Sequence, residues 1–271
     1  MGASGIARCA QAIAERLRQR DGGLLVVTGA GMSAESGLPT YRGVGGLWGQ
    51  VEVMRVATCD ALRRNPRAVW QWFQRLRKVM ANARPNPGHY ALADMEDALA
   101  AVAPVTVVTQ NIDGLHQAAG SRRVVELHGN ALRFYCTCCG RRYQWLPLRL
   151  AELPPRCACG GCLRPDVVLF GEAIPRQAWL EAAGAASQAN VVMVVGTSLQ
   201  VEPAASLPEV AMRHGAMAVE VNIEPTVMST VAPFAFRGFA GEVLPRLADA
   251  LRQALGAGAA SCEKAVMKDF G

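Results

Sequence analysis

Residues 24–37 read LLVVTGAGMSAESG: a short apolar run ends at Thr28 and passes into a loop that contains Gly29, Gly31 and Gly37. A run of this kind is typical of a buried parallel strand. Glycines directly behind such a strand let backbone amides approach the pyrophosphate of a nucleotide at the start of a helix. The stretch therefore predicts a nucleotide site at the end of the first strand, with a purely structural turn as the alternative.

The segment after this loop separates the chain from ordinary dehydrogenases. Their G-x-G-x-x-A pattern, which residues 29–34 match, leads into a full helix and a second strand that ends in an acidic residue about 20 positions on. Here Pro39 and the glycines between residues 43 and 49 intervene. The sequence favours a loop that covers a cofactor, and hydride transfer is not expected because the acidic strand end is missing.

Strand and helix patterns alternate along most of the chain. Apolar runs at residues 105–109, 191–196 and 218–222 resemble the first strand, and helical patterns occupy residues 68–80, 88–100, 178–189 and 243–255. This alternation predicts an α/β fold with a doubly wound, Rossmann-like parallel sheet, whose ligands bind at the carboxyl ends of the strands.

Two stretches break the alternation and predict a smaller inserted lobe. We expect the Rossmann-like domain to comprise residues 1–42, 85–129 and 164–255. The small lobe would comprise a helical module at 43–84 and a cysteine-bearing module at 130–163, and residues 256–271 would form a flexible tail.

Composition excludes several classes of protein. The chain has 271 residues, 51% of them hydrophobic, and a net charge of +6 carried almost entirely by scattered arginines, which suits an anionic substrate or dinucleotide as well as nucleic acid. A nucleic-acid-binding zinc ribbon would need more basic and aromatic residues around the cysteines than are present, so nucleic acid is not expected as the primary partner.

The charged N-terminal helix pattern at residues 6–20 is unlike a signal peptide, and no apolar run could span a bilayer, so a cytoplasmic protein without a membrane partner is expected. The oligomeric state is left open.

Clustered cysteines predict a metal site. Cys136 and Cys139 form a C-x2-C knuckle, and the second pair comes from Cys157, Cys159 and Cys162, so that C-x-C and C-x2-C would both close a tetrahedral site. Four thiolates leave no open position for water or substrate, which indicates structural zinc. The alternative is a loop with free cysteines.

Polar residues follow two of the predicted strands. Gln110-Asn111-Ile112-Asp113 leaves the strand at 105–109, where an amide or carboxylate can hold a carboxamide, a ribose hydroxyl or a water. Local turn chemistry is the alternative. His128 follows the short run 124–127 and is a candidate general base, although a lone histidine is often structural. His116 has a weaker claim, because its helical context suggests packing or orientation.

Seven blocks in this order resemble the sirtuin family of NAD-dependent protein-lysine deacylases, of bacterial type and nearest the branch that includes desuccinylases. They are GAGMSAESGLPTYR at 29–42, TQNIDGLH at 109–116, ELHG at 126–129, the four-cysteine module, RPDVVLFGE at 164–172, VGTS at 195–198 and VNIE at 221–224. The resemblance implies NAD and zinc as cofactors and acyl-lysine proteins or peptides as substrates. The acyl group would pass to ADP-ribose with release of nicotinamide.

The resemblance also implies residue roles. His128 would be the general base, with Asn111 and Asp113 as the other catalytic residues, and the zinc ligands would be Cys136, Cys139, Cys157 and Cys159. The implied cofactor-binding residues are Gly29, Ala30, Gly31, Ser33, Glu35, Tyr41, Arg42, Trp48, Gln110, Asn111, Ile112, Asp113, His128, Gly196, Thr197, Ser198, Asn222, Ile223, Glu224 and Ala240. The implied substrate-binding residues are Ala34, Phe73, Leu76, Val168, Leu169, Phe170, Gly171 and Glu172; the segment 168–172 is similar to one that pairs with the substrate peptide through backbone atoms.

One departure bears on the choice of acyl group. Family members that remove succinyl or malonyl groups carry a Tyr-x-x-Arg pair on the helix that corresponds to residues 65–80, whereas this chain has Phe73 and Leu76 there. A buried carboxylate without a partner costs several kcal/mol. We therefore expect deacetylation, with mono-ADP-ribosyl transfer or removal of acidic acyl groups as the alternatives.

Overall fold

Six parallel strands form the central sheet, in the order β3-β2-β1-β7-β8-β9. The computed structural model describes residues 3–19, 21–40, 55–144, 146–148 and 150–266, with backbone alone for residue 3 and residues 257–266. The strands are β1 (Gly23–Thr28), β2 (Val105–Thr109), β3 (Val124–Glu126), β7 (Ala189–Val195), β8 (Met217–Asn222) and β9 (Phe234–Arg237). The chain builds the sheet from β1 in one direction to β3 and then in the other to β9, so the expected crevice lies beside β1 and β7.

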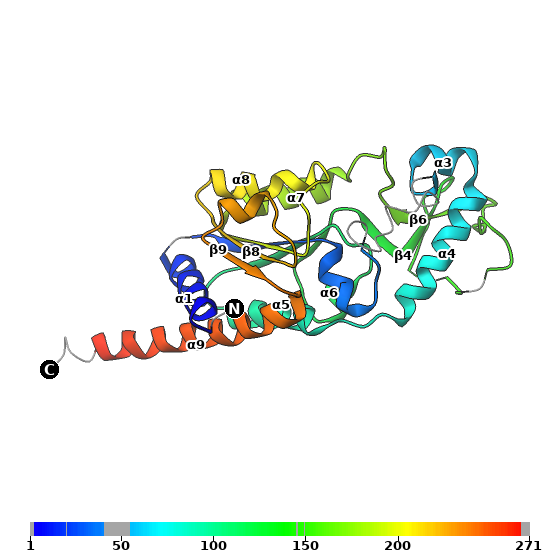
Figure 1. Cartoon of the computed structure of the whole chain (residues 1–271). Coiled ribbons are helices and arrows are strands. Elements are labelled where there is room, and N and C mark those ends of the chain that lie inside the picture. Colours follow the sequence, from blue (N-terminus) through cyan, green and yellow to red (C-terminus); the bar gives the residue numbers. More distant parts are fainter. Residues whose placement is uncertain (1–2, 20, 41–54, 145, 149, 267–271) are drawn as a thin grey trace.

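Helices cover both faces of this sheet (Figure 1). One face carries α1 (Ala3–Gln19), α5 (Pro87–Ala98) and α9 (Ala240–Val266), and the other carries α7 (Arg176–Ser187) and α8 (Leu207–Arg213). Successive side chains of β1 point to opposite faces of the sheet. Leu24 and Val26 belong to the apolar cluster under α1, α5 and α9, and Leu25 and Val27 belong to the cluster under α7 and α8. The predicted doubly wound α/β fold is confirmed.

Two details of the helices complete this layer. The last helix, α9, was expected to end at Leu255 but continues to Val266, so most of the segment expected as a tail is helical. No helix within the described ranges is both long enough and apolar enough to cross a membrane.

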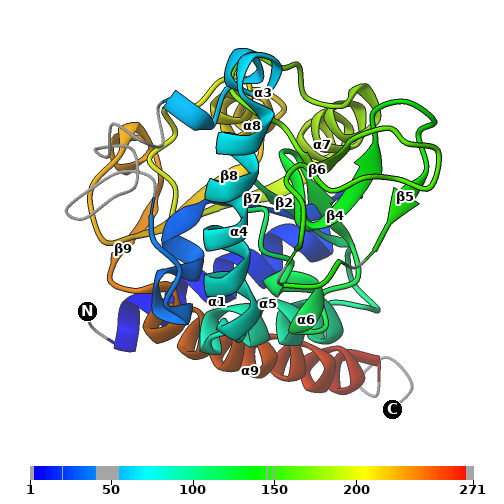
Figure 2. The same cartoon turned by 90° about the vertical axis from the view of Figure 1, so that its right-hand side faces the viewer.

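The small lobe lies at the carboxyl ends of the strands, on the right in Figure 1 and toward the viewer in Figure 2. It contains the helices α3 (Cys59–Arg64) and α4 (Pro66–Asn82) and an antiparallel sheet of order β5-β4-β6, formed by β4 (Gly129–Cys136), β5 (Arg142–Tyr143) and β6 (Leu163–Val167). Trp70 of α4 stacks on Phe134 of β4, with ring centroids 5.7 Å apart, which joins the two modules. The domain boundaries given above stay predictions.

Short elements connect the layers at the carboxyl ends of the strands. They are η1 (Ala30–Ser36), α6 (Leu115–Ala118), η3 (Ala204–Ser206) and η4 (Val227–Thr230). The passage into the small lobe needs a glycine at residue 129, because φ there is +77° and a Cβ atom would lie 2.1 Å from the carbonyl oxygen of Asp166. This close crossing places His128 between the two sheets.

Candidate active site

A cavity of about 1200 Å³ opens where the central sheet meets the small lobe. Its walls come from the carboxyl ends of β1, β2, β7 and β8 together with α4, the segment after β6 and the start of α7. Most of the predicted cofactor residues within the described ranges line it: Gly29, Ala30, Gly31, Gln110, Asn111, Ile112, His128, Gly196, Thr197, Ser198, Asn222, Ile223 and Glu224. These residues therefore lie together at the switch point of the sheet.

The glycine loop packs closely against the end of β7. Gly31 donates its backbone N–H to the carbonyl oxygen of Gly196 at 2.8 Å. Gly196 has a φ of +57°, and a Cβ atom there would lie 2.4 Å from the backbone nitrogen of Met32. The glycines therefore permit close contact between two chain segments, and the amide of Gly31 is used within the protein rather than offered to a phosphate.

Asn111 is oriented by a chain of hydrogen bonds. Its Nδ2 donates to the carbonyl oxygen of Gly29 at 3.0 Å and to Ser33 Oγ at 3.1 Å, and Ser33 Oγ in turn donates to Asp113 Oδ2 at 2.8 Å. Asp113 is buried and also accepts the Leu115 N–H. Burial raises the pKa of Asp113, against the lowering effect of the Leu115 N–H and the Ser33 hydroxyl. Because both N–H groups of the Asn111 amide are engaged, its Oδ1 is the atom available to a ligand.

His128 is held as a neutral base. Its Nδ1 lies 3.0 Å from the carbonyl oxygen of Gln110, which can only accept, so Nδ1 carries the proton and Nε2 keeps a free electron pair. Burial lowers the pKa of His128, and the hydrogen bond to Gln110 opposes that shift. Asn111 and His128 line the same cavity.

His116 has a packing role. It is 1% exposed, its Nε2 lies 3.0 Å from Thr28 Oγ1, and its ring centroid is 4.8 Å from that of His89. Burial, together with the neighbouring His89, lowers the pKa of His116 to about 3. The structure thus favours the packing interpretation of His116 over a role as base.

Several predicted residues lie behind the cavity wall or outside the described ranges. Ser33 contacts Asn111, Asp113 contacts Ser33, and Glu35 accepts the Gly241 N–H at 2.7 Å, next to Ala240 at the start of α9. None of Ser33, Glu35, Asp113, Ala240 and Ala34 is among the described lining residues. Tyr41, Arg42 and Trp48 fall in the range that the structure does not describe.

The predicted substrate residues divide in a similar way. Phe73 and residues 168–172 line the cavity, whereas Leu76 is buried in the same apolar cluster as Phe73 but is not among the lining residues. Sequence reasoning missed Trp72, Trp179 and Leu199, which do line it. For Trp72 the signal was its position next to Phe73 on the helical pattern; nothing in the sequence pointed to the other two.

Residues 168–172 form a turn and not a regular strand. Phe170 pairs with residues 57–59: its N–H donates to the Ala57 carbonyl at 3.0 Å, and its carbonyl accepts the Cys59 N–H at 3.0 Å. The Glu172 N–H donates to the Leu169 carbonyl at 2.9 Å. A bound peptide would therefore have to use the remaining backbone groups of this turn.

The four-cysteine cluster fits zinc. The sulfur atoms of Cys136, Cys139, Cys157 and Cys159 lie within 4.8 Å of one another, with Cys136 Sγ 3.5 Å from Cys159 Sγ and Cys139 Sγ 3.7 Å from Cys157 Sγ. Tetrahedral zinc with bonds of about 2.3 Å needs sulfur separations of about 3.8 Å. The clustered sulfur atoms include that of Cys159 and not that of Cys162. None of the four cysteines is among the described residues that line the cavity. The site is therefore structural.

The comparisons with known proteins agree with this geometry. The family model described as "Sir2 family" matches residues 29–203. The NAD-dependent protein deacylase 2 of Pyrobaculum aerophilum is 50% identical over 232 residues, covering 85% of this chain and 92% of that protein. The NAD-dependent protein deacylase of Pyrococcus furiosus is 46% identical over 239 residues, covering 84% and 93%. Among solved structures, a Sir2 homolog–NAD complex is similar with a TM-score of 0.80 and 37% identity, covering 90% of this chain and 94% of that one.

Proposed function

The chain belongs to the Sir2 family and is an NAD-dependent protein deacylase, and from this premise we propose that it removes acetyl and other neutral acyl groups from lysine in preference to acidic ones. The single observation that carries the proposal is the apolar wall that α4 presents to the cavity. Trp72 and Phe73 line it there, beside Ala57 and Ile112.

The polar residues of the cavity divide the chemical work. When bound, NAD supplies a ribose carbon that the acyl oxygen can attack and a nicotinamide leaving group, so the acyl group ends on ADP-ribose. His128 Nε2 would accept the proton of a ribose hydroxyl, because its Nδ1–H is engaged by Gln110. Asn111 would hold the nicotinamide end through Oδ1, supported by Ser33 and Asp113. Phosphate and adenosine would lie along Gly196–Ser198 and Asn222–Glu224.

The buried arginine of α4 is not positioned to pair with an acidic acyl group in the part of the cavity that the structure describes. Arg77 is 3% exposed and donates to the carbonyl oxygens of Leu146 and Pro147, at 2.6 and 3.3 Å, so it points into the small lobe. Arg176 is the one arginine among the described lining residues, and it comes from the start of α7. A succinyl carboxylate against Phe73 would lose its hydration without gaining a charged partner, at a cost of several kcal/mol.

Turnover of one peptide in acetyl-lysine and succinyl-lysine forms tests the proposal. We expect kcat/KM for the acetyl form to be at least about tenfold higher, corresponding to 1.4 kcal/mol or more. The variant Phe73→Arg supplies a guanidinium at a position that lines the cavity and should move the ratio toward the succinyl form. Faster succinyl removal by the unmodified chain would contradict the proposal.

A further inference from the structure

Strand β8 buries a carboxylate where an apolar side chain would otherwise fill the core. Glu220 is fully buried at 0% exposure, on the same face of β8 as Ala218, while Val219 and Val221 belong to the core on the opposite face. A buried carboxylate is costly unless it is paired and hydrogen-bonded. Its retention inside the sheet therefore requires specific partners.

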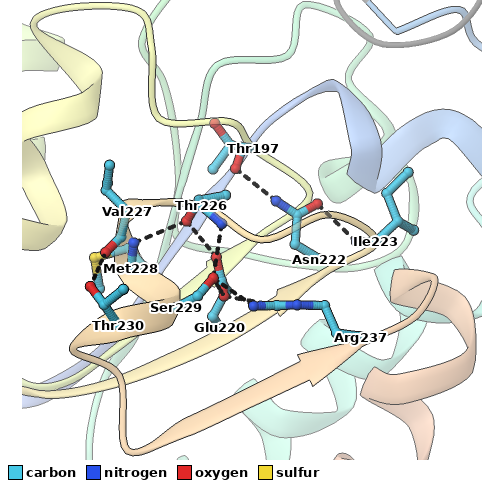
Figure 3. Close-up of polar contacts among 10 residues, drawn as sticks. All are labelled: Thr197, Glu220, Asn222, Ile223, Thr226, Val227, Met228, Ser229, Thr230 and Arg237. Atoms are coloured by element: carbon cyan, nitrogen blue, oxygen red, sulfur yellow. Dashed lines mark hydrogen bonds and ion pairs between the residues drawn. The ribbon is translucent and has the colours of Figure 1, made fainter.

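Three side chains supply these partners (Figure 3). The Thr226 hydroxyl donates to Oε1 of Glu220, and Ser229 Oγ donates to Oε2 at 2.6 Å. Arg237 of β9 donates from Nη1 to the same Oε2 at 2.8 Å and from Nη2 to Ser229 Oγ at 2.5 Å. We call these four residues the Glu220 cluster; both carboxylate oxygens are occupied in it.

The two hydroxyls also cap the short helix η4. Thr226 Oγ1 accepts the Met228 N–H at 3.1 Å, and Ser229 Oγ accepts the Thr226 N–H at 2.8 Å. Each hydroxyl thus accepts from the turn and has its own proton left to donate. Only a group that accepts at both oxygens satisfies both protons, and the Glu220 carboxylate is such a group.

The turn held by this cluster forms part of the cavity wall. Glu224, Pro225, Thr226 and Val227 line the cavity, and the start of the turn is fixed by Asn222, whose Nδ2 donates to the Thr197 carbonyl at 3.0 Å. Apolar packing of the turn is sparse: Ile223 is 54% and Val227 72% exposed, and Met228 is its buried anchor. Since few apolar contacts hold it, its position depends on the polar contacts with Glu220.

We propose that the Glu220 cluster is a set of positioning residues that fixes the cavity wall over residues 222–227 and thereby raises the affinity for the adenosine half of NAD. This inference rests on the proposed function, which places adenosine along Asn222–Glu224. The acyl-peptide side of the cavity is built from α4 and from residues 168–172, so its affinity should not depend on the cluster.

Direct binding of ADP-ribose, measured by calorimetry, tests the proposal together with steady-state kinetics. Thr226→Val removes the hydroxyl at nearly constant volume and should weaken ADP-ribose binding about tenfold, equivalent to about 1.4 kcal/mol. KM for NAD should rise in parallel, while kcat at saturating NAD and KM for the peptide stay within about twofold. Thr226→Ser restores the hydroxyl and should restore binding.

Controls separate this role from a general loss of stability. Glu209→Gln removes one member of the exposed ion pair between Glu209 and Arg213 and should leave binding unchanged. If Thr226→Val binds ADP-ribose like the wild type while its Tm falls, the cluster is structural only and the proposal is overturned. A wild type that binds ADP-ribose without deacylating peptides would instead contradict the proposed function, and one that does not bind ADP-ribose would overturn both.

Discussion

Arg164 and Glu172 form an ion pair across the turn that borders the cavity. Replacing Arg164 by Met should lower the free energy of unfolding by about 2 kcal/mol. Arg164 Nη1 lies 2.7 Å from Glu172 Oε1 and Nη2 lies 3.0 Å from Oε2; Nη2 also donates to the Val167 carbonyl at 2.7 Å. The two side chains are 11% and 25% exposed. Breaking a fully buried ion pair costs about 3–5 kcal/mol and an exposed pair contributes about 0–1 kcal/mol, so a pair of intermediate exposure falls between these values.

A double-mutant cycle in urea unfolding isolates this pair. Arg164→Met, Glu172→Gln and the double variant should give a coupling energy of about 1–2 kcal/mol at pH 7, whereas the exposed Arg213–Glu209 pair should give less than about 0.5 kcal/mol. Burial tends to raise the pKa of Glu172, but hydrogen bonds from Arg164 and the Leu169 N–H lower it overall. The coupling is therefore fully present above the unfolded pKa of about 4.3 and is lost as pH falls through the lower folded pKa. Additive single variants at pH 7 would refute this reasoning.

Two further predictions concern the metal and the base. Cys139→Ser removes one of the four clustered sulfurs and should lose zinc and the folded small lobe, whereas Cys162→Ser should keep both. Metal analysis and circular dichroism of the two variants measure these losses. Equal zinc content in the two variants would contradict the assignment of Cys139 as a ligand and Cys162 as a free thiol. Because burial lowers the pKa of His128 below its ordinary 6.5, kcat/KM should fall only as pH drops below about 6.5, and an acid limb centred above pH 7 would be inconsistent with His128 as the base.

Much of the site was predictable from the sequence, because parallel strands end at the same edge of a sheet. The runs at residues 24–28, 105–109, 191–196 and 218–222 became four adjacent strands, in the order β2-β1-β7-β8, and the glycines and amides behind them lined one cavity together with His128. The metal register was left open by spacing, since C-x-C and C-x2-C both close a tetrahedron. The positions of the sulfur atoms selected Cys159 over Cys162.

What the sequence did not reveal depends on contacts between distant segments. Ser33 donates a hydrogen bond to Asp113, and Glu220 accepts one from Arg237 of the next strand. Neither contact is indicated by a sequence pattern near the residues involved. Helical phase placed Phe73 and Leu76 on one face of α4, but the depth of packing decided that only Phe73 reaches the cavity. The expected end of α9 was placed too early because the small residues after Leu255 offer little surface to bury, although alanine-rich residues favour a helix.

Nicotinamide release from NAD in the presence of an acetyl-lysine peptide, for the wild type and for His128→Ala, is the sharpest experiment on the cavity that Asn111 and His128 share. Release by the wild type should depend on the peptide and yield acyl-ADP-ribose. His128→Ala should lose deacylation by at least about 100-fold, while its affinity for ADP-ribose stays within about threefold of the wild type. Retention of deacylation in His128→Ala would contradict the assignment of the imidazole as the base in this cavity.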